Sequence, residues 1–312
     1  MDGTYPIWGE GLSRDAYRSW NRAQLATAWG RDHLRRMAWT NDRTLLASAK
    51  RYDFHARVGG DPAPVLGIGA VFTPGDRRGR GHARELIEAM LADGSVRGCR
   101  YALLFSEIGS PFYESLGFRV LPRTWATLAV VPKSGRGAPA TFVRSGETTD
   151  LPLIAEISAR YGEGQTFSLE RSPELIGFGF ARRRLLAGFG PAGLREVEFF
   201  VAEEGHRPAA YVFITRGPAG AVLEECGDRD PSGARVGAIL QVLAARTPAD
   251  PLLRMNGWLP ADLRPPQVRI VAEMPAPEIM MIRPIGDAPW PIAAGAPDLA
   301  DPRIAYWQTD VF

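Results

Sequence analysis

One stretch decides the fold: residues 71–91 read Val71-Phe-Thr-Pro-Gly-Asp-Arg-Arg-Gly-Arg-Gly-His-Ala-Arg-Glu-Leu-Ile-Glu-Ala-Met-Leu91. The apolar run that leads into it, residues 65–72, lies between two prolines and is typical of a buried strand. After the glycines, apolar residues recur at i, i+3, i+4, i+7 and i+8, which predicts a helix packed by one face on a sheet. A strand, a glycine-rich turn and a helix in this order form a cradle for phosphate, because glycines let the backbone approach an anion and the helix N-terminus attracts it.

The spacing within the turn excludes two common phosphate motifs, since neither Gly-Lys-Ser/Thr at P-loop spacing nor Gly-x-Gly-x-x-Gly is present. The turn instead contains Arg78-x-x-Gly81-x-Ala83. This resembles the Arg/Gln-x-x-Gly-x-Gly/Ala signature of the GNAT superfamily of acyl-CoA N-acyltransferases, the alternative being an arginine-rich surface turn. A second segment, Phe112-Tyr113-Glu-Ser-Leu-Gly117-Phe118, is similar to the family's Phe-Tyr-x-x-Leu-Gly-Phe and follows a predicted strand in the family's order.

The resemblance implies an α/β (α+β) fold whose two central strands splay apart, with the acyl thioester of acetyl-CoA lying between them. It places the following residues at the cofactor: Val71, Phe72, Arg77, Arg78, Gly79, Arg80, Gly81, His82, Ala83 and Ser106. Ser106 stands where many family members carry an asparagine, which puts that one contact in doubt.

The resemblance also implies the catalytic groups of amine acylation. Tyr113 is the candidate acid that returns a proton to the departing thiolate. Glu107, at the end of the second splayed strand, is a candidate base, although a surface carboxylate explains it equally well. We interpret His82 as a surface side chain rather than a base.

The composition indicates which class of protein this is and in which cellular compartment we expect it. A length of 312 residues predicts two domains, and 45% hydrophobic with 23% charged residues is typical of a globular protein. A formal net charge of +2 gives no reason to expect a nucleic-acid partner. Cys99 and Cys226 are too few for a disulfide framework, and we find neither a signal peptide nor a long apolar run. We therefore expect a cytoplasmic protein without membrane contact or a metal.

We expect a catalytic GNAT domain at residues 1–131, a turn-rich linker at 132–140 and a second domain at 141–312. We expect residues 118–130 to close the first sheet, and residues 278–284 to belong to the second domain. The turn before the main helix of that domain carries Glu224, Glu225, Asp228 and Asp230, and like charge there opposes a pyrophosphate. We favour a degenerate GNAT-like copy without the cofactor motif over an unrelated α+β cap.

Within the superfamily, the chain is most similar to the fungal lysine N-acetyltransferase type, through Leu66-Gly-Ile-Gly-Ala-Val-Phe-Thr-Pro74 and Leu104-Phe-Ser-Glu-Ile-Gly109. This implies an acetyl-CoA-dependent N-acetyltransferase acting by direct transfer on a primary amine of a small molecule, with lysine or a related amino acid first. The alternatives are a non-catalytic acyl-CoA sensor or scaffold and a peptide or protein N-acetyltransferase.

The ends of the chain carry two further expectations. Tyr17, Trp20 and Trp29, in a helix predicted near residues 15–29, either line the acceptor pocket or, as we favour, pack in the core. The apolar tail at residues 304–312 should dock, and we favour an edge strand of the second sheet. Mycobacterial acetyltransferases of the superfamily look similar in ending on a phenylalanine whose carboxylate is the base, which makes the Phe312 carboxylate or Asp310 a candidate.

Overall fold

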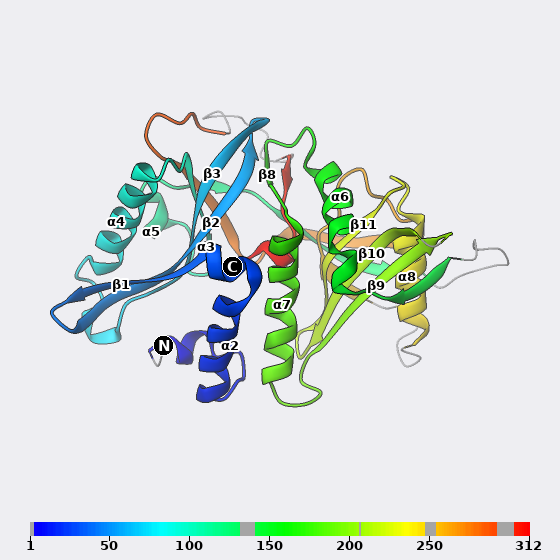
Figure 1. Cartoon of the computed structure of the whole chain (residues 1–312), viewed down its shortest axis with the longest axis horizontal. Helices are drawn as coiled ribbons and strands as arrows, with labels where there is room; N and C mark the ends of the chain where they lie inside the picture. The colour runs from blue at the N-terminus through cyan, green and yellow to red at the C-terminus, as the bar shows by residue number, and fades with distance from the viewer. Residues whose placement is uncertain (1–2, 132–140, 206, 247–253, 292–302) are drawn as a thin grey trace.

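The computed structural model describes residues 3–131, 141–205, 207–246, 254–291 and 303–312, and it contains two sheets (Figure 1). The first sheet has the order β15-β8-β2-β3-β4-β14-β5, with β1 paired to β2. Its strands are β1 (Leu34–Asn41), β2 (Thr44–Val58), β3 (Asp61–Phe72), β4 (Tyr101–Ser106), β5 (Arg119–Leu121), β8 (Phe167–Leu169), β14 (Ile279–Pro284) and β15 (Ile304–Ala305). The second sheet has the order β13-β6-β12-β11-β10-β9-β7. Its strands are β6 (Thr124–Val130), β7 (Phe142–Ser145), β9 (Glu196–Glu204), β10 (Arg207–Gly217), β11 (Gly220–Asp228), β12 (Arg254–Gly257) and β13 (Val268–Pro275).

Helices cover both sheets. They are α1 (Tyr5–Trp8), α2 (Arg14–Ala26), α3 (Ala28–His33), α4 (His82–Val96), α5 (Pro111–Glu114), α6 (Leu151–Gly162), α7 (Pro173–Phe189) and α8 (Ala234–Ala245), with short 3-10 turns η1 (Gly75–Arg77), η2 (Thr148–Asp150) and η3 (Gln308–Asp310). Ser13 caps α2 as predicted, because its hydroxyl accepts from the Ala16 N–H. The predicted helix at residues 15–29 is divided at Thr27, whose extended backbone ends α2 and whose side chain caps α3.

The two central strands of the first sheet splay apart, as predicted. Strands β3 and β4 pair in parallel from Val65 with Tyr101 to Ile68 with Leu104, and there the pairing stops. Beyond this point Ala70 has a positive φ of 48°, and the register of β3 with β2 shifts between Ser48 and Lys50. A bulge of this kind bends its strand, so the end of β3 turns away from β4 and leaves an opening at Gly69.

The two sheets exchange strands. Strand β6 leaves the first sheet and lies between β12 and β13 of the second, whereas β14 returns to lie between β4 and β5 of the first. Two predictions are therefore wrong: only residues 119–121 of the expected closing hairpin stay in the first sheet, and residues 278–284 do not complete the second. The physical reason is that an apolar run such as Met280-Met281-Ile282, buried on both faces, indicates a central strand but not the sheet that it joins. The predicted linker at 132–140 lies outside the described residues, and the division of the chain there stays a prediction.

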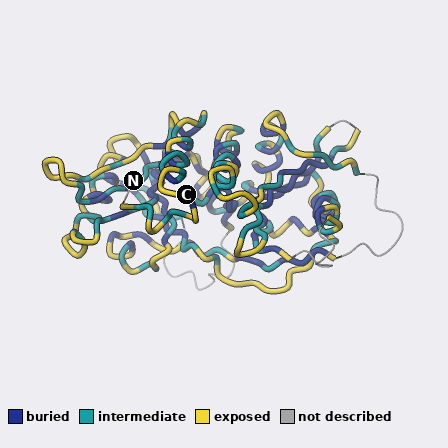
Figure 2. The backbone as a smooth tube through the Cα atoms, turned by 90° about the horizontal axis from the view of Figure 1, so that it is seen from below, coloured by how far each residue is buried: buried dark blue, intermediate teal, exposed yellow. Residues whose placement is uncertain are grey.

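Helix α7 lies between the two sheets and contributes to both cores (Figure 1). Leu175 and Phe178 pack with the aromatic core of the first sheet, which includes Trp29 and Tyr52. Ile176 and Phe180 pack with the core of the second. Figure 2 shows the result, buried segments in both halves with the exposed backbone at the outer loops. None of the helices in the described part of the chain has the length and apolarity needed to cross a lipid bilayer.

The exchanged strand predicts one effect on stability. Met281 in β14 is fully buried against the α4 side of the first sheet, so Met281→Ala should lower the free energy of unfolding by about 2 to 5 kcal/mol. Met274→Ala in β13, where the side chain is 42% exposed, is the matched control and should cost less than about 0.5 kcal/mol. Urea unfolding measures both, and equal losses would show that β14 is not packed in the first core.

Candidate active site

The strand, the glycine-rich turn and the helix of the predicted phosphate cradle form where the sequence predicts them. Strand β3 leads through η1 to Gly79 and Gly81, whose φ angles of 73° and 85° lie in the left-handed region. Gly81 is the N-cap of α4 and no side chain caps this helix start, so its first N–H groups point to solvent-accessible space. These features fit a phosphate group, which a helix N-terminus and unhindered glycines can approach closely.

Within the described part of the chain, the cradle arginines Arg77 and Arg78 contact only their near neighbours in sequence. Arg77 pairs with Asp76 at 3.1 Å, Arg78 Nε donates to the Thr73 carbonyl at 3.3 Å, and Arg80 is exposed. His82 contacts Glu85 at 3.2 Å, and Glu85 also accepts from Trp39 Nε1 at 2.9 Å. The side chain of His82 is 18% exposed, so it lies half-buried beside Glu85 rather than free on the surface.

The residues expected beside the thioester lie at the ends of the splayed strands. Val71 is half-buried and Phe72 is buried at the end of β3. Ser106 ends β4, but its hydroxyl donates to the Gly109 carbonyl at 2.6 Å and so stabilises the following turn. The proton of the Ser106 hydroxyl is therefore engaged within the protein and is not available for donation to a cofactor.

Tyr113 lies on α5 beside the end of β4, packed edge-on against the rings of Phe112 and Phe118. Burial, and secondarily the negative charge of Glu107, raises the pKa of Tyr113 to about 12. No hydrogen bond from its hydroxyl to another described residue occurs. A phenol in this state keeps its proton at neutral pH, as an acid must.

Glu107 is exposed at the turn after β4 and accepts from Trp8 Nε1 at 3.4 Å. The contact brings helix α1 over the end of β4. The structure thus brings Glu107 near Tyr113, within the range of its charge, but leaves it in water.

The C-terminal tail enters the first sheet at the splay. The Phe312 ring lies 4.4 Å from the ring of Tyr52, 5.1 Å from Phe54 and 5.3 Å from Phe105. A Cβ at Gly69 would lie 3.1 Å from Phe312 Cδ2 and 3.4 Å from its main-chain oxygen.

The tail joins the first sheet, because strand β15 pairs with β8. The expectation of an edge strand in the second sheet is therefore wrong. The space that Gly67 and Gly69 leave for the Phe312 ring was not predicted from the sequence. Alternate glycines inside a strand are a signal that another group packs closely on the backbone.

An ion network holds the tail in place. Arg171, just before α7, pairs through two nitrogens with Glu225 of β11 at 2.6 and 2.7 Å and through Nε with Asp310 at 3.1 Å. Asp310 also accepts from the Trp307 N–H at 3.2 Å, and its main-chain oxygen accepts from the Tyr306 hydroxyl. Burial raises the pKa of Asp310 to about 6, against the effect of Arg171. Asp310 is therefore committed to the network and is poorly placed to act as a base.

Three of the four carboxylates of the second half lie in β11 rather than in a turn, whereas Asp230 lies in the turn after it and accepts from the Ser232 N–H at 3.0 Å. Glu224 pairs with Arg183 at 3.0 Å, and Glu225 pairs with Arg171. Asp228 accepts from the Arg235 N–H at 3.0 Å and from its guanidinium at 2.8 Å, at the start of α8. A protein carboxylate thus lies at the helix start of the second half, where α4 in the first half is open.

The aromatic residues near the N-terminus divide between core and site. Trp29 stacks on Phe54 at 5.2 Å inside the core, and Tyr17 is buried with its hydroxyl donating to Thr4. Trp20 is half-buried, donates to the Arg182 carbonyl at 3.3 Å and lies 5.7 Å from Lys50 Nζ. Of the three, Trp20 is the half-buried one, and it lies beside Lys50, the strand partner of Gly69.

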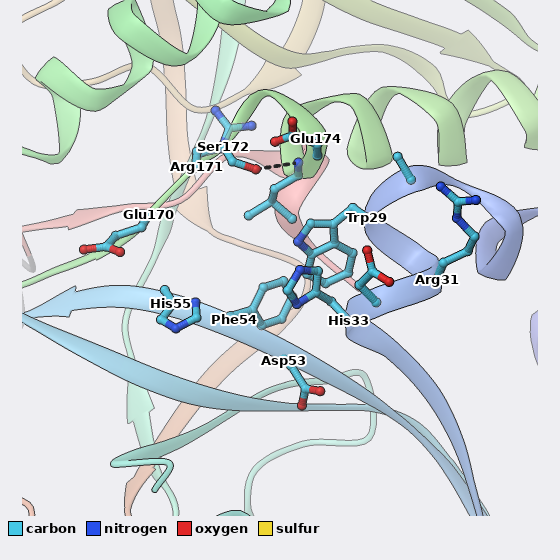
Figure 3. Close-up of a pocket in the computed structure, with 13 residues that line it drawn as sticks. Trp29, Arg31, His33, Asp53, Phe54, His55, Glu170, Arg171, Ser172 and Glu174 are labelled. Atoms are coloured by element: carbon cyan, nitrogen blue, oxygen red, sulfur yellow. Dashed lines mark hydrogen bonds between the residues drawn. The ribbon is translucent and has the colours of Figure 1, made fainter. Parts of the chain in front are cut away.

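A hollow of about 530 Å³ lies on the far side of Trp29 (Figure 3). His33 stacks on Trp29 there, and Asp53, His55, Glu170 and Glu174 surround it. His55, which lines the hollow, lies five residues along β2 from Lys50, the strand partner of Gly69. Five residues of strand span roughly 16 Å. The hollow is thus separate from the splay. In the described part of the chain, no group of three His, Cys, Asp or Glu side chains is placed to hold a metal ion.

Comparison with known proteins agrees with this geometry. Residues 12–121 match the family described as the Acetyltransferase (GNAT) domain, which is less than half of the chain. No curated protein sequence matches significantly.

Solved structures share the fold over most of the chain. A probable N-acyltransferase from Enterococcus faecalis V583 is 14% identical with a TM-score of 0.67, over 91% of this chain and 68% of that one. A GCN5-related N-acetyltransferase from Kribbella flavida is 15% identical with a TM-score of 0.64, over 90% and 67%. Eis1 from Mycobacterium abscessus is 16% identical with a TM-score of 0.53, over 80% and 64%. At such identities the likeness to solved structures establishes the fold alone. The match of residues 12–121 to the Acetyltransferase (GNAT) domain indicates that the chain is an acyltransferase.

Proposed function

We propose that the protein is an acetyl-CoA-dependent N-acetyltransferase that transfers the acetyl group directly to a primary amine of a small molecule, lysine or a related amino acid first. The observation that carries the proposal is the opening at Gly69, where β3 leaves β4. The uncapped start of α4 lies beyond the end of β3, Tyr113 lies beside the end of β4, and Phe312 packs into the opening itself.

Each group has a role in this reaction. Acetyl-CoA supplies an activated acyl thioester, and the N–H groups at the start of α4, with Arg77, Arg78 and Arg80, hold its phosphates. The end of β3 at Val71 and Phe72 offers backbone N–H groups to the acyl carbonyl. Tyr113 donates its proton to the sulfur as the C–S bond breaks, and the new C–N bond forms with the acceptor amine.

The base that receives the amine proton is the carboxyl group of Phe312 in a chain that ends at this residue. Its support is the position of the Phe312 main-chain oxygen at Gly69, whereas Asp310 is held by Arg171. Glu107 is the second candidate and would act through water, because it is exposed.

The second half is proposed to be a degenerate copy that binds no cofactor. In it, β10, β11, α8 and β12 repeat the order of β2, β3, α4 and β4, and β11 pairs with β12 in parallel as β3 does with β4. Asp228 at the start of α8 would repel a phosphate.

A charge placed at the cradle tests the cofactor site. Gly81→Glu should abolish acetyl-CoA binding in calorimetry, because it places a carboxylate at the uncapped start of α4. Gly98→Glu is the control: it lies just beyond the other end of α4, also has a positive φ (78°) and also has nothing within 4 Å of an added Cβ. Equal affinities in the two variants would place the phosphates elsewhere.

Release of free thiol from acetyl-CoA across a panel of amines tests the reaction, and Tyr113→Phe tests the acid. Removing this hydroxyl should lower turnover by about 10²-fold with acetyl-CoA affinity little changed. Tyr101→Phe, which removes a buried hydroxyl that donates to Pro289 at 2.9 Å, should keep full activity. Binding of acetyl-CoA without turnover on any amine would favour the sensor, and full activity of Tyr113→Phe would make its hydroxyl structural.

Two changes at the tail separate the Phe312 ring from its carboxyl group. Deleting Phe312 moves the carboxyl group back by one residue and should lower turnover by about 10²-fold, while the pair of Arg171 and Asp310 stays intact. Phe312→Ala keeps the carboxyl group and removes only the ring, so its turnover should remain well above that of the deletion. Equal turnover in the two variants would assign the tail to packing alone.

A further inference from the structure

Three cations gather on the tail side of the splay. Lys50 is one of only two lysines in the chain, and it pairs in register with Gly69 of β3 on one side and with Arg36 of β1 on the other. Directly opposed residues point to the same face of a sheet, so Arg36 and Lys50 share the face on which Tyr52 contacts Phe312. Arg182 of α7 approaches this face and adds the third positive charge.

No carboxylate side chain of the described residues neutralises these cations. Lys50 Nζ donates to Gln24 Oε1 at 3.4 Å and lies over the Trp20 ring. Arg182 donates through Nη1 to the Val311 carbonyl at 2.6 Å, but its buried Nε has no partner. Among the described residues, no carboxylate forms an ion pair with Lys50, Arg36 or Arg182. Arg171, at the other end of the tail, shows the contrast, because two carboxylates neutralise it.

Three neighbouring positive charges without a neutralising carboxylate repel one another and disfavour the charged form of Lys50. Burial, followed by repulsion from Arg182 and Arg36, lowers the pKa of Lys50 to about 7. An anion bound among the three would remove that repulsion and satisfy the open donor of Arg182. The cluster is also accessible, since Arg36 is exposed and Lys50 and Arg182 are half-buried.

We propose that Lys50, Arg182 and Arg36 bind a carboxylate of the amine acceptor, an inference that rests on the proposed N-acetyltransferase function. Lys50 is one strand away from Gly69, about 4.8 Å in the hydrogen-bonding direction, so the amine of a short amino acid bound here can reach the opening. The substrate class is thus an amine that also carries a carboxylate, and the same charges disfavour polyamines that lack one.

Pairs of amines that differ only in the carboxylate test the assignment. Lysine with cadaverine and ornithine with putrescine are titrated by calorimetry into the full chain saturated with CoA. The parent protein should bind the carboxylated member tighter by on the order of tenfold or more, the worth of one charge-assisted contact. Lys50→Met should remove most of this preference, and Arg36→Met, at an exposed position, should reduce it.

Arg35→Met is the matched control and should keep the full preference. Arg35 is the neighbour of Arg36 in β1, faces the other side of the strand and donates to main-chain carbonyls at 2.7 and 2.9 Å. Equal binding of the paired amines by the parent, no binding of the carboxylated members, or an unchanged preference in Lys50→Met would each overturn the inference. Since the readout is binding, a carboxylate preference without thiol release would count against the proposed reaction alone.

Discussion

The position of the tail depends on one buried interaction, the guanidinium of Arg171 held between Glu225 and Asp310. The three residues come from the start of α7, from β11 of the second sheet and from η3, and all are almost fully buried. One cation between two carboxylates, with Ser158, Thr309 and Tyr211 donating or accepting around them, satisfies charges that would otherwise destabilise the interior. Removal of one member of such a network typically costs about 3 to 5 kcal/mol, because the remaining charges stay buried. The second half therefore fixes Asp310, and Asp310 fixes where Phe312 lies in the first.

The strand exchange makes the same connection through the backbone. Strand β14 hydrogen-bonds to β4, the strand that forms one side of the opening, and β6 hydrogen-bonds to β12, which follows α8 in the second half. Separating the halves would expose strand edges in both sheets, those of β2, β4, β5, β12 and β13, and the apolar residues of β14, which is unfavourable in water. The width of the opening at Gly69 is thus set by elements from both halves, although the cradle and Tyr113 come from the first half alone.

The parts that could be predicted from the sequence are those written in local patterns. The turn at Gly79 and Gly81 and the helix after it follow from residues close together in the chain, whereas the splay of β3 from β4 is implied only by the family resemblance. The strand exchange could not be predicted in this way, because Met280 to Ile282 are apolar whichever sheet they join. The carboxylates of β11 show a related limit: a sequence gives the charge of Glu225 but not the distant Arg171 that neutralises it. Likewise, Lys50 sits in an ordinary strand pattern, and only the register with Arg36 and Gly69 shows its neighbours.

Positive charge lies on both faces of the first sheet at the opening. On one side the start of α4 and its arginines form a positive region beyond the end of β3, and on the other Lys50, Arg36 and Arg182 form a second. In the proposed reaction the acceptor amine lies between them. A positive surrounding lowers the pKa of an ammonium group, so more of the amine is in its neutral, nucleophilic form at neutral pH. Deprotonation by the base is then easier, since the carboxylate at Phe312 accepts a proton from an ammonium group whose pKa is already lowered. A site that binds its acceptor through a carboxylate therefore also favours the deprotonation that acetyl transfer requires.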